Sequence, residues 1–223
     1  VPPHDGWNVP LLRDGQVVQQ PAEQTTLTRR YTEYVQQFIR QNKAGPFFLY
    51  FAHTFPHVPL FASPSFRGKS PRGLYGDVVE ELDGSVGRIL EALRREGLEK
   101  NTLVLFTSDN GPQLSGEGED CTVRYNCGYR GAKGTVFEGG IRVPMVLRWP
   151  DGGLTGGASS DALVHFTDWL PTLLAVAGAA APAGLQLDGR NALPVLRGER
   201  DGSPPCRFWQ WNRYTPLVES NAA

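Results

Sequence analysis

The chain of 223 residues contains only three cysteines and four histidines, and it has no long apolar run. Three cysteines do not make a disulfide framework. Cys121 and Cys127 are close enough in sequence to bridge across a loop, but they can equally remain free thiols, and Cys206 is left over. No set of Cys and His has zinc-ligand spacing. No apolar run approaches the length of a membrane-spanning helix, so no membrane span is expected.

The chain also lacks an excess of charge of either sign. It has 22 basic and 23 acidic residues, which give a net charge of -1. This balance gives no reason to expect nucleic acid or an anionic membrane surface as a partner. The first residue is Val1, and neither an initiator methionine nor a signal-peptide pattern follows. That start fits a chain whose beginning has been removed.

What is present is the composition of an ordinary globular protein, with 40% hydrophobic residues and a length sufficient for one sizeable core. Residues 1–23 are polar and Pro-rich, and we interpret them as loop. Apolar residues spaced three or four apart then predict two amphipathic helices. These stripes are Leu27, Tyr31, Tyr34, Val35, Phe38 and Ile39 in the first helix, and Leu74, Val78, Leu82, Val86, Ile89 and Leu93 in the second.

Short apolar runs bounded by turn residues predict strands at 47–51, 103–107 and 143–149. The order strand, helix, strand implies that the first two strands are parallel, joined by a right-handed crossover in an α/β sheet. A third helix is expected to start with Thr167 as N-cap, to carry Asp168 in its first turn and to end at Gly178. The aromatic stretch 207–214 is interpreted as the possible start of another sheet.

Polar residues follow two of the predicted strands. Asp109 and Asn110 come after 103–107, and His53 and His57 come after 47–51. The carboxyl ends of strands in open α/β sheets are where ligands bind. Asp and Asn offer the oxygen donors that Ca²⁺ or Mg²⁺ prefers. Asp-Asn-Gly-Pro is also ordinary turn chemistry, and a lone His is more often structural than catalytic.

A lysine, Lys133, lies in the Gly-rich segment 131–140. Such a lysine can bring a positive charge to an oxyanion, although a Lys between glycines is usually a solvated loop residue. The sequence therefore indicates a metal-assisted site for an anionic substrate.

Taken in order, these motifs resemble the sulfatase family, the arylsulfatase-like branch of the alkaline phosphatase superfamily. The resemblance covers nearly the whole chain, and its specificity comes from the joint occurrence of motifs that are individually weak. The motifs are Pro46-Phe47-Phe48-Leu49-Tyr50-Phe51, His57-Val58-Pro59, Gly76-Asp77, Glu81-Leu82-Asp83, Thr107-Ser108-Asp109-Asn110-Gly111-Pro112, Gly131-Ala132-Lys133-Gly134-Thr135, Glu138-Gly139-Gly140-Ile141-Arg142-Val143-Pro144 and Asp168-Trp169-Leu170-Pro171-Thr172.

The resemblance implies an α/β fold that is part of an alkaline-phosphatase-like sandwich. Its mostly parallel or mixed sheet would be flanked by helices, and the chain would be truncated at both ends. Residues 1–200 would form the second half of the catalytic domain, and residues 201–223 the start of a small C-terminal subdomain.

The resemblance also assigns roles to individual residues. Asp109 and Asn110 match the second pair of ligands to a divalent cation, usually Ca²⁺. Lys133 matches the lysine that contacts the sulfate and the bridging oxygen. His57 matches the histidine that hydrogen-bonds the ester oxygen and protonates the leaving group. Arg130 is a candidate substrate contact and, with Glu138 and Arg142, is expected to brace the loop that carries Lys133. His53 has no firm counterpart and is assigned a supporting or structural role.

One element of the family pattern is missing. The formylglycine nucleophile is made from the first residue of a C/S-x-P-S-R motif, which this sequence lacks, because Ser63-Pro64-Ser65-Phe66-Arg67 has the wrong spacing. The first acidic pair of metal ligands is also absent. We therefore expect a sulfuric ester hydrolase fragment that hydrolyses no sulfate ester by itself.

Two alternatives remain open. One is a phosphoryl- or phosphonate-ester hydrolase of the same superfamily, and the other is a non-catalytic remnant that binds sulfated glycans through Lys133 and Arg130. The expected partner is a sulfate-ester small molecule or a sulfated carbohydrate. The sequence leaves the particular ester and the oligomeric state open. The family resemblance implies a periplasmic or secreted protein.

Overall fold

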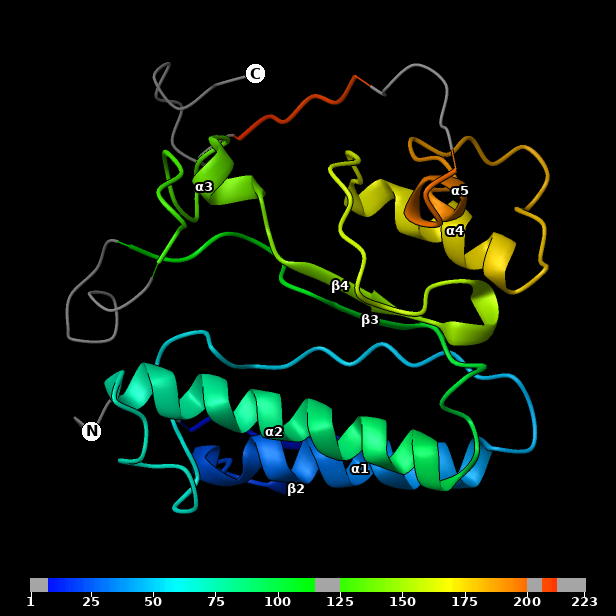
Figure 1. The fold of residues 1–223 in the computed structure, drawn as a ribbon. Helices are drawn as coiled ribbons and strands as arrows, with labels where there is room; N and C mark the ends of the chain where they lie inside the picture. The colour runs from blue at the N-terminus through cyan, green and yellow to red at the C-terminus, as the bar shows by residue number, and fades with distance from the viewer. Residues whose placement is uncertain (1–7, 115–124, 200–205, 212–223) are drawn as a thin grey trace. The chain divides into compact units, whose positions relative to one another are not determined.

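The computed structural model describes residues 8–114, 125–199 and 206–211. They belong to two compact units (Figure 1). The first unit comprises Val1–Glu99 with Pro112–Gly128, and the second comprises Lys100–Gly111 with Tyr129–Ala223. None of the helices in the described ranges combines the length and apolar character needed to cross a membrane.

The first unit begins with a β-hairpin, which corrects the interpretation of residues 1–23 as loop. Strands β1 (Leu11–Arg13) and β2 (Gln16–Gln19) pair antiparallel. Asp14 and Gly15 between them both have positive φ, at 51° and 78°. Two consecutive residues of this kind favour a two-residue hairpin turn, and Asp-Gly is its strongest sequence signal. The polar, Pro-rich surroundings concealed that signal.

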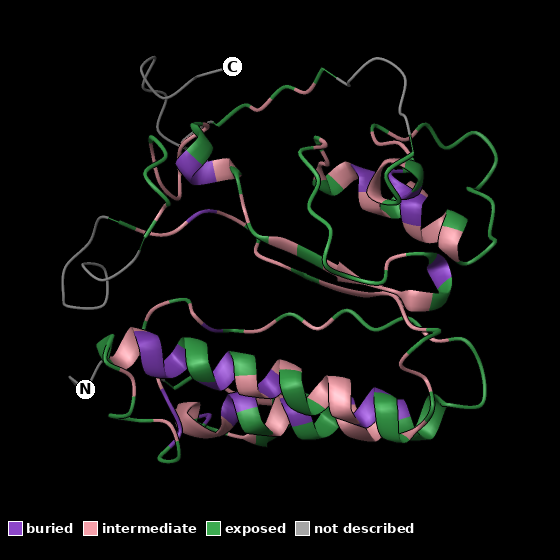
Figure 2. Cartoon of the chain, viewed as in Figure 1, coloured by how far each residue is buried: buried purple, intermediate pink, exposed green. Residues whose placement is uncertain are grey.

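Both predicted amphipathic helices of this unit are confirmed as α1 (Leu27–Asn42) and α2 (Gly73–Arg95). They pack against each other along their buried faces (Figure 2). The contact includes a buried hydrogen bond of 2.6 Å between the hydroxyl groups of Thr32 and Ser85. The core of the unit combines helical residues with residues from the segment between the helices: Leu27, Val78 and Leu82 with Phe55, Leu60 and Ala62.

The prediction of a strand at 47–51 was wrong. This segment is extended chain without strand assignment, and Phe48 and Tyr50 are 70% and 82% exposed. A strand forms only where a second strand accepts its backbone hydrogen bonds. Among the described residues, no strand pairs with this segment. The predicted parallel crossover is therefore also absent from the described part of the chain.

A buried carboxylate organises the loop before α2. Asp77 accepts hydrogen bonds from the backbone N–H groups of Gly68, Lys69 and Ser70, at 2.7, 3.0 and 2.8 Å. Burial alone raises the pKa of Asp77, but the three N–H donors and the charge of Arg67 outweigh it and hold the pKa below its ordinary value of 3.8. The charged carboxylate therefore stabilises the folded unit.

Replacing Asp77 with Asn is expected to lower the stability at neutral pH by about 3 kcal/mol, because hydrogen bonds to a charged acceptor are lost. A lowered pKa stabilises the fold above the unfolded-state pKa, and this contribution disappears as pH falls through the folded-state value. The difference between wild type and variant should therefore be constant near neutrality and shrink below about pH 4. Denaturant unfolding across pH measures it.

The control for this prediction is Asp83→Asn, which changes an exposed carboxylate on the same helix. It should alter stability by less than about 0.5 kcal/mol at any pH. Equal, pH-independent losses in both variants would contradict the role given to Asp77.

The second unit contains the other two predicted strands. They are confirmed as β3 (Val104–Thr107) and β4 (Met145–Arg148), which pair antiparallel with Val104 opposite Arg148 and Thr107 opposite Met145. The short helix α3 (Glu138–Ile141) lies between them in sequence, and the 3₁₀ turn η4 (Pro150–Gly152) follows β4. The pairing brings the start of β4 beside the end of β3, where Asp109 follows.

The predicted third helix is present, but Thr167 is not its cap. The chain enters through a 3₁₀ turn, η5 (Phe166–Asp168), into α4 (Trp169–Val176), and α5 (Leu193–Leu196) follows. His165 is the cap of η5: its ring accepts from the N–H of Thr167, and the Asp168 carboxylate accepts from the N–H of His165 at 2.8 Å. The imidazole replaces the hydroxyl that the sequence pattern suggested.

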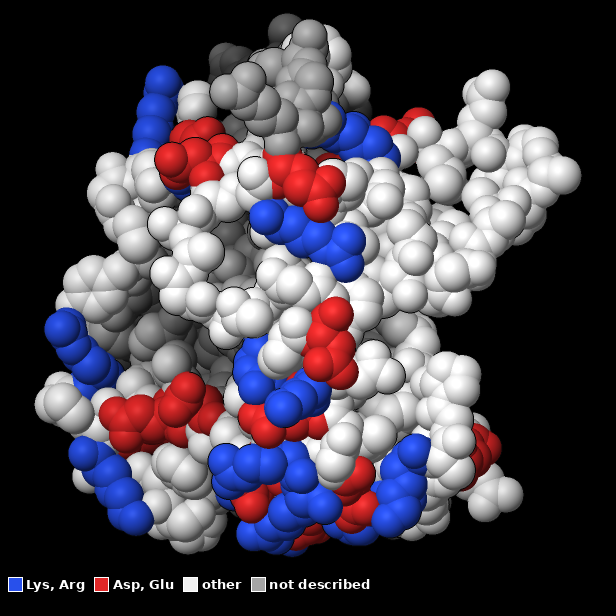
Figure 3. All heavy atoms as spheres, turned by 45° about the vertical axis from the view of Figure 1, so that its right-hand side comes forward, with Lys and Arg blue, Asp and Glu red and all other residues white. Residues whose placement is uncertain are grey.

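Acidic and basic side chains are interspersed over the face of the molecule shown in Figure 3 rather than gathered by sign. This distribution agrees with the small net charge of the sequence, -1.

Candidate active site

The end of strand β3 presents two oxygen donors. Ser108 donates from its hydroxyl to the carbonyl of Asn110 at 3.1 Å, which folds the chain into a turn. The Asn110 side chain donates from Nδ2 to the carbonyl of Gly111 at 3.0 Å. This bond leaves the amide oxygen, Oδ1, available as an acceptor. Asp109 is exposed. Among the described residues, no group donates a hydrogen bond to its carboxylate.

The donor set of this turn fits part of a hard-cation site. One carboxylate and one amide oxygen are the ligand types that Ca²⁺ or Mg²⁺ takes. Ca²⁺ requires about six to eight oxygens, so these two side chains can supply only a share of them. Within the described ranges no group of three or more His, Cys, Asp and Glu side chains could hold a metal ion.

Glycine backbone connects this turn to α3. The N–H of Gly111 donates to the carbonyl of Gly140 at 2.8 Å. A Cβ atom on Gly111 would lie 1.9 Å from the carbonyl oxygen of Gly139, a distance no side chain tolerates. Only glycine allows such an approach of two backbones. Backbone contact with residues 139–140 therefore fixes Gly111, the residue that follows Asn110.

The same two glycines hold the loop that carries Lys133. The N–H of Gly139 donates to the carbonyl of Arg130 at 2.7 Å. A Cβ atom on Gly140 would lie 2.3 Å from the carbonyl oxygen of Thr135. Thr135 closes the loop by hydrogen bonds of 2.9 to 3.3 Å between its N–H and hydroxyl groups and the backbone of Ala132. We call residues 111, 139 and 140 the glycine junction.

Lys133 lies in the turn of this loop and is half-buried. No acidic side chain in the described part of the chain forms an ion pair with it in the structure. Among the described residues, no acidic side chain therefore neutralises the charge of its ammonium group. The glycine junction thus links a turn with two oxygen donors to a loop with one cationic donor.

Aromatic rings and arginines support the base of the loop. The guanidinium of Arg130 lies 3.8 Å from the ring centroid of Phe137, and that of Arg142 lies 4.9 Å from the ring of Tyr129. Arg142 also forms an exposed ion pair of 3.3 Å with Glu138, which by itself contributes little. That Arg130, Glu138 and Arg142 brace this loop stays a prediction.

His57 belongs to the first unit. The segment that carries it is held by buried residues on either side of it in the chain. Phe55 and Leu60 are 6% and 5% exposed and pack in the helical core, whereas His57 itself is exposed. Its Nδ1 lies 2.6 Å from the carbonyl oxygen of Val58. Because a carbonyl oxygen only accepts, Nδ1 is the donor of this bond, and Nε2 takes no part in it.

His53 is the second histidine of this segment. Both of its ring nitrogens are buried and have no hydrogen-bond partner within the structure's described residues. Its ring packs on Phe51, with centroids 4.1 Å apart. Burial lowers the pKa of His53 from 6.5 to about 4, so the ring is neutral at physiological pH. Its assignment to a supporting or structural role stays a prediction.

The structure thus links Asp109 and Asn110 with the loop of Lys133 and Arg130 in the second unit, and it places His57 and His53 in the first. No separate sequence signal indicated the glycine junction, although Gly111 and Gly139-Gly140 stand inside the two site motifs. Cys127 and Cys206 carry exposed free thiols. Cys121, the other half of the possible bridge, lies outside the described residues.

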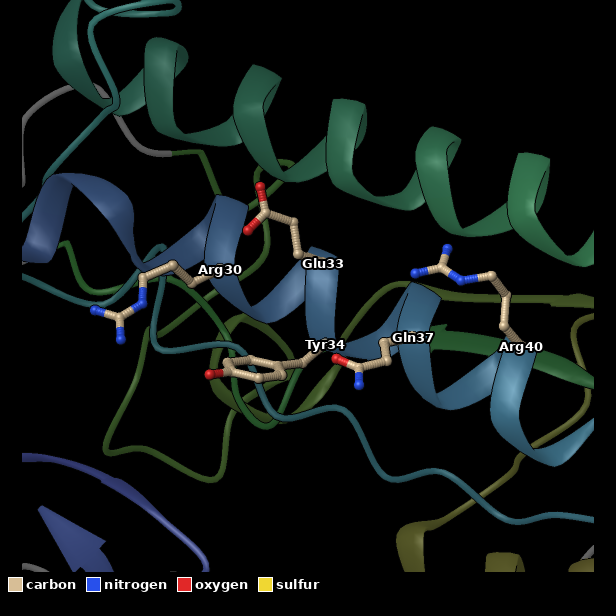
Figure 4. Close-up of a pocket in the computed structure, with 5 residues that line it drawn as sticks. All are labelled: Arg30, Glu33, Tyr34, Gln37 and Arg40. Carbon is tan, nitrogen blue, oxygen red and sulfur yellow. The ribbon is translucent and has the colours of Figure 1, made fainter. Parts of the chain in front are cut away.

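A surface hollow on α1 contains none of the predicted site residues. It has a volume of about 290 Å³ and is lined by Arg30, Glu33, Tyr34, Gln37 and Arg40 (Figure 4). Tyr34 was predicted in the apolar stripe of this helix but is 38% exposed and lines the hollow, and Glu33 is paired with Arg29 at 2.8 Å. We interpret the hollow as part of a solvated helix face.

Comparison with solved structures identifies the class of fold. A crystal structure of Ps i-CgsB in complex with k-i-k-neocarrahexaose matches with a TM-score of 0.72 and 32% identity, over 86% of this chain and 42% of that one. The chain therefore has the mixed α/β, alkaline-phosphatase-like fold that its sequence predicts. The likeness extends over most of the described residues.

Sequence comparison then identifies the family. The family model described as Sulfatase matches residues 4–179. Mouse steryl-sulfatase is 41% identical over 196 residues, covering 86% of this chain and 31% of that protein. Human N-acetylgalactosamine-6-sulfatase is 40% identical over 215 residues, covering 91% of this chain and 40% of that protein. The chain therefore belongs to the sulfatase family, and it spans less than half the length of these relatives.

Proposed function

We propose that this chain contributes part of the active site of a sulfuric ester hydrolase. The observation that carries the proposal is the glycine junction, which fixes Gly111, the residue that follows Asn110, by backbone contact to the loop of Lys133. Hydrolysis of a sulfate ester needs charge stabilisation on the sulfate oxygens and on the leaving oxygen. Oxygen donors for a cation and a free ammonium group are the side chains suited to these tasks.

Each residue of the chain has a distinct part in the proposed reaction. Asp109 and Asn110 would hold a divalent cation, which supplies Lewis-acid polarisation of the sulfate oxygens when bound. Lys133 would stabilise negative charge on the bridging oxygen as the S–O bond breaks. His57, protonated at Nε2, would donate that proton to the leaving alkoxide and become neutral. Arg130 would contact the substrate beside Lys133.

The nucleophile of the proposed reaction is a formylglycine supplied from outside these 223 residues, since the sequence contains no C/S-x-P-S-R motif. The 223-residue chain by itself is therefore expected to hydrolyse no sulfate ester. Assay of purified chain with 4-nitrophenyl sulfate, with the protein at its full native length as the comparison, measures this. Turnover by the short chain would refute the assignment of the nucleophile.

The reaction class has its own test in the full-length protein. We expect hydrolysis of 4-nitrophenyl sulfate to exceed hydrolysis of 4-nitrophenyl phosphate and of a phenylphosphonate monoester under the same conditions. Faster turnover of either phosphorus ester would assign the chain to phosphoryl or phosphonate chemistry. Binding of a sulfated glycan with no turnover of any ester would assign it to the non-catalytic class.

A further inference from the structure

The segment 206–211 is attached to the second unit although it forms neither helix nor strand. Arg207 pairs with the carboxylate of Asp168 and donates to the carbonyl of Asp188 at 2.9 Å. Asp168 is fully buried and also accepts from the N–H of Arg190 at 2.9 Å. Trp209 packs edge to face on His165, with ring centroids 5.4 Å apart. These contacts hold the segment in place.

Exposure alternates along this segment. Arg207 and Trp209 are partly buried, whereas Cys206, Phe208 and Gln210 are exposed. Trp211, the last residue of the segment, breaks this alternation and is 44% exposed. The protein surface that it meets must therefore leave much of its ring uncovered.

That surface is the turn of the Lys133 loop. The heavy atom nearest to a Cβ built on Gly134 is Cζ2 of Trp211, at 3.9 Å. Gly134 has a φ of 85° and no side chain that could cover the indole. The indole edge thus lies against the residue that follows Lys133 in the chain, and Trp211 remains 44% exposed.

We propose that Trp211 is a stacking platform for the pyranose ring whose sulfate ester is contacted by Lys133. This inference rests on the proposed function and adds to it the class of the leaving group, a sugar alcohol. A pyranose has an apolar C–H face that packs on an aromatic ring and a polar rim that remains in water. A partly exposed indole against the loop that carries Lys133 suits such a ligand, since aromatic rings with a wet edge serve surfaces of mixed polarity.

A sterol would require a different surface. Apolar ligands of that size are bound in concave pockets that bury most of their area. The residue that Trp211 meets in the loop is instead a glycine, Gly134, which follows Lys133 in the chain, and Arg130 stacks on Phe137 at the base of the loop. The observations on this loop therefore favour a sulfated sugar.

The test uses the full-length protein and separates the sugar ring from the sulfate. Inorganic sulfate, as a competitive inhibitor, reports the anion site without a ring, and N-acetylgalactosamine 6-sulfate and galactose 6-sulfate report the ring. Trp211→Ala is expected to raise KM, or the inhibition constant, for the sulfated sugars about tenfold. That factor equals about 1.4 kcal/mol of binding free energy. Inhibition by inorganic sulfate should remain unchanged, and Trp211→Phe should restore most of the sugar affinity.

The matched control is Phe208→Ala, which removes an aromatic ring that is 83% exposed in the same segment. It should leave both sugar affinity and sulfate inhibition unchanged. Equal sugar affinity of wild type and Trp211→Ala would overturn the inference, as would wild-type turnover of 4-nitrophenyl sulfate without binding of either sulfated sugar. Absence of 4-nitrophenyl sulfate turnover in the wild type would instead refute the proposed function itself.

Discussion

Replacement of Lys133 with alanine is expected to lower kcat for 4-nitrophenyl sulfate in the full-length protein by about 10²- to 10³-fold, the usual loss when one charge-stabilising donor is removed. Lys133 forms no ion pair with an acidic side chain of the described residues, so its charge is available to the substrate. Because negative charge on the bridging oxygen develops only as the S–O bond breaks, kcat and kcat/KM should fall together. Steady-state kinetics of purified variants measures both.

Two further variants sharpen this result. Lys133→Arg keeps the charge but replaces a compact ammonium by a planar fork, so it should recover only part of the activity. Lys100→Ala removes an exposed lysine of the same unit and should leave kcat unchanged. A loss of less than threefold in Lys133→Ala, or a rise in KM with constant kcat, would show that Lys133 does not act on the leaving oxygen.

The helices α1, α2 and α4 and the strands β3 and β4 could be predicted from the sequence because their signals are local, whereas the hairpin of β1 and β2 and the short helices α3 and α5 were not predicted. The stripes of α1 and α2 specify a buried face directly, and the runs of β3 and β4 are bounded by turn residues on both sides. The segment 47–51 has an equally strong apolar run but forms no strand in the described structure. Strand formation depends on a partner, which is not encoded in the segment itself.

The site shows the same division between local and distant information. Asp109, Asn110 and Lys133 stand in short motifs that the sequence displays, and they stay predictions of function. The contacts that hold them are different in kind. Gly111 and Gly140 meet through backbone atoms, and Trp211 meets Gly134 although the two are far apart in sequence. The sequence does not indicate which distant backbone segment approaches a given glycine. These contacts could therefore be identified only from the structure.

The glycine junction leads to the second large effect. Substituting Gly140 with alanine is expected to destabilise the chain by about 3 kcal/mol, the upper part of the range for overpacking. The new Cβ would lie 2.3 Å from the carbonyl oxygen of Thr135 and 2.6 Å from that of Ala132. Both obstacles are backbone atoms of the Lys133 loop, which cannot rotate away as a flexible side chain would. Denaturant unfolding measures the loss.

The same substitution should weaken cation binding, because Gly140 also accepts the hydrogen bond of Gly111, next to Asn110. Calorimetric titration of the full-length protein with Ca²⁺ tests this second consequence. Gly87→Ala is the matched control: Gly87 is exposed within α2, and a Cβ atom added there would meet no other atom within 4 Å. That variant should gain about 0.5–1 kcal/mol through helix propensity and bind the cation as the wild type does. If Gly140→Ala were as stable as the wild type and bound Ca²⁺ equally well, the junction would not be what positions the site.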